Sequence, residues 1–99
     1  MNKLLIAAVL AAAPLGAAAQ DNPAARSLAA TCAACHGTEG RSVTKEVPGL
    51  AGLAKDHIVA QMKAFRDGAR PASVMHQIAK GYSEQQIELM ADYFAGRPR

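Results

Sequence analysis

The segment from Cys32 to His36 holds the residues of this 99-residue chain whose types and spacing most clearly carry chemistry. It reads Cys-Ala-Ala-Cys-His, so that two thiols stand three residues apart and an imidazole follows the second thiol directly. This pattern is typical of a covalent attachment site for haem c. Each thiol can form a thioether with one vinyl group of the porphyrin, and His36 can then donate a ring nitrogen to the iron. We therefore predict one haem c, attached through Cys32 and Cys35, with His36 as an axial ligand.

Two cysteines at this spacing have other uses. A thioredoxin-like dithiol would need a strand before the motif and a βαβ context, and the sequence pattern indicates neither. A zinc site built from Cys32, Cys35 and two His would lack a second compact pair of ligands. A disulfide or thiol redox role in an oxidising compartment remains the alternative.

A second axial ligand would have to come from the second half of the chain, where the candidates are Met62, Met75, Met90, His57 and His76. Met62 and Met90 fall on apolar helical stripes, which favours core packing. Met75 follows Pro71 in a segment expected to be irregular, where its side chain could turn toward the haem. His76 is the runner-up, although an exposed polar role is expected for both histidines. With His and Met bound, the iron would have no open position and would transfer electrons only; an open iron would instead suit an enzyme or sensor.

The elements that must position these residues are predicted to be helices and loops, giving an all-α fold of three to four helices around the haem. The chain has no alternating stretch long enough to indicate a strand. Caps, apolar stripes and glycine positions predict a first helix from Pro23 to about Ala34, a loop over 37–53, a second helix over 54–67, a helical turn within 73–80, and a final helix between the Ser83–Gln86 capping box and Gly96.

The start of the chain is predicted to be an export signal covering residues 1–19, followed by a single domain over residues 20–99. Lys3 precedes an apolar run that is too short to remain as a membrane span, and Ala17 to Ala19 suit signal peptidase. We therefore expect a periplasmic protein with no membrane span after cleavage. Its charge is only mildly basic and its basic residues are scattered, which argues against nucleic-acid binding.

These residues resemble the class I c-type cytochromes across nearly all of residues 20–99. The segments CAACHGTEG, PGLAG, HIVAQMKAFRDGAR and VMHQIAKGYSEQQIELMADYFAG follow that family's order of haem site, proline loop, middle helix, methionine loop and final helix. The resemblance implies that Met75 is the distal ligand and that the Pro48 carbonyl accepts a hydrogen bond from the second nitrogen of His36. It also implies that the final helix crosses the first near Tyr93 and Phe94.

Within this family, CAACHGT and VMHQIAKGYS look most like the haem subunit of flavocytochrome c sulfide dehydrogenase. That likeness implies a non-catalytic subunit that accepts electrons from an FAD-containing sulfide dehydrogenase and passes them to other redox proteins. Some such subunits carry two haem domains, whereas this chain has one CxxCH motif. A free periplasmic electron shuttle is the alternative, and its transient contact could be ringed by the cations Lys45, Lys55, Lys63, Arg66, Arg70 and Lys80.

Overall fold

The computed structural model describes residue 8 and residues 22–99. Apart from residue 8, the expected export signal over residues 1–19 lies outside the described residues. Within the described part the chain is helical and contains no strand. The elements in order are α1 (Pro23–Ala30), α2 (Ala33–His36), the 3₁₀ turn η1 (Thr38–Gly40), α3 (Lys55–Asp67), α4 (Met75–Lys80) and α5 (Glu84–Ala95). The predicted all-α fold is therefore confirmed, with five α-helices among the described residues.

The first helix begins as the sequence predicts but is divided in two. Asn22 caps α1, because its side-chain oxygen accepts the amide N–H of Ala24 at 2.9 Å. The amides of Thr31 and Cys32 then bond to carbonyls three residues back, at 3.3 and 3.0 Å, which tightens the chain into a turn. The Thr31 hydroxyl also donates to the Leu28 carbonyl at 2.8 Å and so competes with continued α-helix. The prediction of one helix to about Ala34 was wrong at this turn, after which α2 begins.

The later helices end where the sequence predicts, within one or two residues. The Ser83 side chain accepts the Gln86 amide at 3.1 Å while the Gln86 side chain accepts the Ser83 amide at 2.9 Å, so the predicted capping box starts α5. Gly68 ends α3 in the left-handed conformation. The expected turn within 73–80 is a regular helix that begins at Met75, so this residue opens α4 and the prediction of an irregular position for it was wrong.

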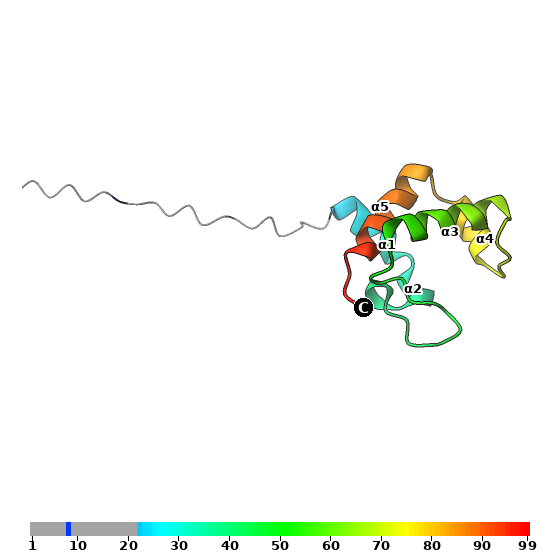
Figure 1. Cartoon of the computed structure of the whole chain (residues 1–99), viewed down its shortest axis with the longest axis horizontal. Helices are drawn as coiled ribbons and strands as arrows, with labels where there is room; N and C mark the ends of the chain where they lie inside the picture. Colours follow the sequence, from blue (N-terminus) through cyan, green and yellow to red (C-terminus); the bar gives the residue numbers. More distant parts are fainter. Residues whose placement is uncertain (1–7, 9–21) are drawn as a thin grey trace, which may run out of the picture.

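The core lies where α1 and α5 pack against each other and α3 packs on α5. α1 contributes Ala25 and Ala29, whose small side chains allow the close approach of α5. To this core α3 adds Ile58, and α5 adds Ile87, Met90, Ala91 and Phe94. α4 packs against α3, and Figure 1 shows it beside one end of that helix, with the loop after η1 projecting away from the helices.

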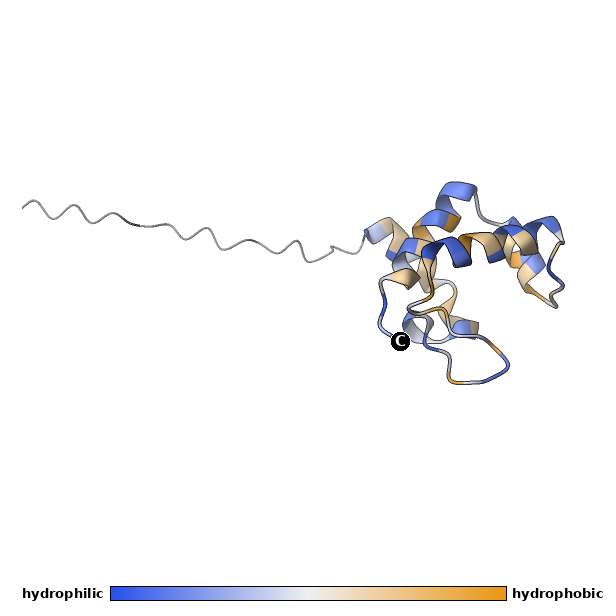
Figure 2. Cartoon of the chain, viewed as in Figure 1, coloured by the Kyte–Doolittle hydropathy of each residue, from blue (hydrophilic) through white to orange (hydrophobic). Residues whose placement is uncertain are grey.

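Figure 2 shows hydrophilic and hydrophobic residues alternating along the helices. The Lys55 ammonium lies 3.1 Å from the Asp92 carboxylate, and this contact, which links α3 with α5, raises the pKa of Lys55.

No helix among residue 8 and residues 22–99 has the length and apolar character needed to cross a bilayer.

Gly40 fixes the irregular loop against α5. It adopts a φ of 78°, and a Cβ atom there would lie 2.8 Å from the Phe94 ring and 2.9 Å from the Ala51 amide nitrogen. Its carbonyl accepts the amides of Leu50 and Ala51 at 2.8 and 3.1 Å. This close contact holds the segment that contains Pro48 near the end of α2.

Candidate haem site

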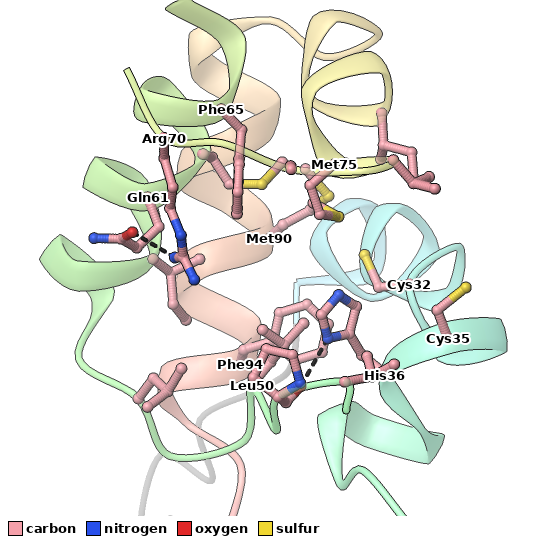
Figure 3. Close-up of a pocket in the computed structure, with 18 of the residues that line it drawn as sticks. Cys32, Cys35, His36, Leu50, Gln61, Phe65, Arg70, Met75, Met90 and Phe94 are labelled. Carbon is pink, nitrogen blue, oxygen red and sulfur yellow. Dashed lines mark hydrogen bonds between the residues drawn. The ribbon is translucent and has the colours of Figure 1, made fainter. Parts of the chain in front are cut away.

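A cavity of about 480 Å³ opens between the Cys-His segment, the proline loop and the second half of the chain. Its size is in the range of cofactor sites. Most of its lining side chains are apolar, including Leu50, Ile58, Phe65, Ile87 and Phe94. Figure 3 shows His36 and Met75 on opposite sides of this space, with Cys32 and Cys35 along one side and Gln61, Phe65 and Arg70 across from them.

His36 ends α2, and its side chain is buried with 8% of its surface exposed. Its Nδ1 lies 2.7 Å from the carbonyl oxygen of Pro48, which is the pair of atoms that the resemblance named. A carbonyl can only accept, so Nδ1 carries the proton and donates it. The other ring nitrogen, Nε2, therefore keeps its lone pair for a metal. Such a carbonyl partner also fixes the orientation of the ring.

Cys32 and Cys35 are both free thiols in the structure, Cys32 half-buried and Cys35 exposed. Cys32 caps α2 and so lies one turn before His36. Burial raises the pKa of the Cys32 thiol. Reactive redox cysteines have lowered pKa values instead. This environment does not favour the thiol redox alternative.

The residues that the sequence offered as second axial ligand are distributed unevenly around the cavity. Met62, Met75, Met90 and His57 all line it, so the two methionines assigned to core packing also border this space. His76 is half-buried, and its Nδ1 is buried without a hydrogen-bond partner among the described residues. The expectation of an exposed His76 was therefore wrong, because α4 forms a regular helix that packs on α3.

Arg70 and Gln61 were not singled out by sequence reasoning as site residues. The Arg70 guanidinium lies 4.6 Å from the centre of the Phe65 ring and donates to the Gln61 side-chain oxygen at 2.5 Å. Both residues line the cavity. Their contact could not be foreseen, since Arg70 follows the Gly68 stop of α3 and reaches back over the helix only in three dimensions.

Several of the cations expected to ring a docking contact have internal partners. Lys55 pairs with Asp92, Arg66 donates to the Tyr82 carbonyl and Arg70 packs on Phe65. Lys45, Lys63 and Lys80 are exposed. These six cations therefore do not form a continuous ring of free charges.

The donor set fits haem. The site combines an apolar cavity, one thiol a turn before and one directly before a buried imidazole with a free Nε2, and a thioether across the cavity. These features match a large, flat, apolar group with an iron at its centre. The residues fit zinc less well, since no group of three His, Cys, Asp or Glu side chains that could hold a metal ion lies within the described part of the chain.

Comparison with known proteins gives the same picture. The family model for cytochrome c matches residues 22–96. Cytochrome c4 of Pseudomonas aeruginosa is 36% identical over 99 residues, which cover 98% of this chain and 49% of that protein. The cytochrome subunit of sulfide dehydrogenase from Chlorobaculum tepidum is 39% identical over 67 residues, covering 68% of this chain and 60% of that subunit.

A third relative is matched over nearly its whole length. Cytochrome c-554(548) of Halomonas halodenitrificans is 34% identical over 82 residues, which cover 80% of this chain and 99% of that protein. By contrast, the chain spans about half the length of the cytochrome c4 and three fifths of the sulfide dehydrogenase subunit.

Proposed function

This chain belongs to the cytochrome c family, and we propose that it is a periplasmic haem subunit that accepts single electrons from a flavoprotein sulfide dehydrogenase. Membership makes it an electron carrier with one covalently bound haem c, held at the CxxCH motif, and not itself an enzyme. The partner, the compartment and the axial ligands are the proposed part. One observation carries the ligand assignment, namely the Nδ1 hydrogen bond to Pro48 that leaves His36 Nε2 free opposite Met75.

When bound, haem supplies an iron that takes up and releases one electron. His36 would hold that iron through Nε2, and the Pro48 carbonyl holds the ring in one orientation. The Met75 thioether would be the second ligand to the iron, which would exclude small ligands and favour the reduced state. Leu50, Phe65 and Phe94 line the site with apolar side chains and would shield the bound haem from water. Arg70, fixed by Gln61 and Phe65 in the cavity lining, would supply a positive charge for the carboxylates of haem.

Replacement of Met75 tests the ligand assignment. In M75A we expect the weak long-wavelength sulfur-to-iron band of the oxidised protein to disappear and the reduced protein to bind carbon monoxide. The potential should fall by on the order of 100 mV, since axial ligands govern haem potentials. M62A, which truncates a second methionine of the cavity, should keep the band. Loss of the band in M62A but not in M75A would overturn the assignment, and its loss in His76→Ala alone would point to the runner-up.

The likeness to a sulfide dehydrogenase subunit supports the proposed partner, and co-purification tests it. A tagged chain produced in its own host should retain a flavoprotein in a fixed ratio through gel filtration in high salt. The near-complete match to cytochrome c-554(548) favours a second candidate, a free electron shuttle. Isolation of the haem protein alone, at working concentration and low salt, would support the shuttle and overturn the subunit.

The proposed compartment follows from residues 1–19 and from the chemistry of haem attachment, which takes place outside the cytoplasm. The mature protein should begin near Gln20 and be released from the periplasm by osmotic shock. N-terminal sequencing of the haem-loaded chain checks this. Retention of Met1 in that chain would contradict it.

A further inference from the structure

Tyr82 links three separate parts of the chain. Its ring lines the cavity and packs against the hydrophobic core. Its hydroxyl lies 2.7 Å from the Thr31 hydroxyl oxygen, across 51 positions of sequence. Its backbone carbonyl accepts a hydrogen bond from the Arg66 guanidinium of α3. One residue thus joins the segment after α4 to α3 and to the residue that directly precedes Cys32.

The direction of the hydroxyl bond follows from its neighbours. The Thr31 hydroxyl has one hydrogen, and it donates this hydrogen to the Leu28 carbonyl at 2.8 Å. Thr31 must therefore accept from Tyr82, which is the donor. A Phe at position 82 would remove this bond while the Thr31 bond to Leu28 stays intact, so the substitution isolates one interaction.

The position of Tyr82 gives the bond its consequence. α4 begins at Met75, and only Gly81 separates its last residue, Lys80, from Tyr82. α4 packs on α3, while Tyr82 fastens the end of the same segment to the Cys-His side of the cavity. A movement of residues 75–82 as one unit away from Thr31 would carry Met75 out of the cavity and would strain or break the Tyr82 bond.

We propose that Tyr82 is a positioning residue, a latch that keeps the Met75 segment closed over the haem. This inference rests on the proposed role of Met75 as a ligand. A foreign ligand such as imidazole can reach the iron only when Met75 leaves. The latch therefore weakens imidazole binding, because the apparent affinity is the affinity of the open form multiplied by the fraction of molecules that are open.

Imidazole titration of the oxidised haem protein tests the latch, with loss of the sulfur-to-iron band as the readout. In Y82F we expect about two- to tenfold tighter apparent binding, the range that one net hydrogen bond allows. The band before titration should stay, because Met75 is still present. Thr31→Val should have a similar effect, and the double variant should bind no more tightly than the tighter single variant, since both changes remove one bond.

Y93F is the matched control, because Tyr93 is also half-buried but packs edge-to-face on Phe94 instead of reaching Thr31. It should bind imidazole as the unmodified protein does. An equal gain in Y93F, or no gain in Y82F and Thr31→Val, would overturn the latch while leaving Met75 as ligand. If M75A keeps the sulfur band, the ligand assignment and the latch both fail. Should Y82F not fold, Thr31→Val alone decides.

Discussion

The contact between α1 and α5 and the wall of the cavity are built in opposite ways. At the first, Ala29 and Ala91 are buried almost completely, with 3% and 0% of their surfaces exposed, and helix meets helix directly. At the second, Leu50, Phe65 and Met75 border a space of about 480 Å³ that protein atoms do not fill. Of the buried positions in α5, Ile87, Met90 and Phe94 border the cavity as well as the core.

This difference indicates which region is stabilised by the chain alone and which region depends on the cofactor. The α1–α5 contact completes its packing from the chain alone, whereas the cavity wall completes its packing only around the cofactor. Apolar side chains that border an unfilled space lose packing contacts, which lowers stability. Haem should therefore act as the missing half of the core, and the two regions should respond differently to change.

Removal of both thiols should have the largest effect. In C32A/C35A we expect no covalent haem, and the cofactor-free chain should lose cooperative thermal unfolding because its cavity wall collapses. Far-UV circular dichroism during heating measures this. C35A, which keeps one thioether, should retain haem and a sharp transition at lower temperature. A sharp, unshifted transition in the haem-free double variant would contradict the division described above.

Overpacking of the helix contact should have a smaller effect confined to stability. A91L adds bulk at a position with no exposed surface, so we expect the free energy of unfolding to fall by about 1–3 kcal/mol. Ala91 does not line the cavity, so the absorption spectrum should stay unchanged. Urea unfolding of the haem protein gives the first quantity. A60L, on the exposed face of α3, is the control and should change little. An altered sulfur band in A91L would show that the two regions are not independent.

Local signals in the sequence predicted the closed region better than the cavity. Asn22, the Ser83–Gln86 box and Gly68 act over a few residues, and the start of α1, the end of α3 and the start of α5 lie within one or two positions of the prediction. The division of the first helix was missed because it depends on the Thr31 hydroxyl. Its bonds with the Leu28 carbonyl and the Tyr82 hydroxyl are visible only in the structure.

At the site, the sequence predicted the covalent attachment of haem but not the packing of the side chains around it. The CxxCH spacing is itself the chemical signal, so the cofactor could be predicted from five residues. No short sequence pattern connects Arg70 with Gln61 or Tyr82 with Thr31. The burial of His76 likewise has no signal in such a pattern. Such contacts depend on how α3 and α4 meet, which periodicity does not specify.

The capping box at the junction of the two regions gives the smallest and most discriminating effect. Ser83 lies between the segment that carries Met75 and the first residue of α5. In S83A we expect the free energy of unfolding to fall by about 1 kcal/mol, because the Gln86 amide loses its acceptor. Urea unfolding measures this, and Q85A, an exposed neighbour outside the box, should change less. If the cap serves α5 alone, the sulfur band and imidazole affinity of S83A will match those of the unmodified protein. A gain in imidazole affinity as large as that in Y82F would instead place the start of α5 within the cavity region, and the boundary between the two regions would then lie inside that helix.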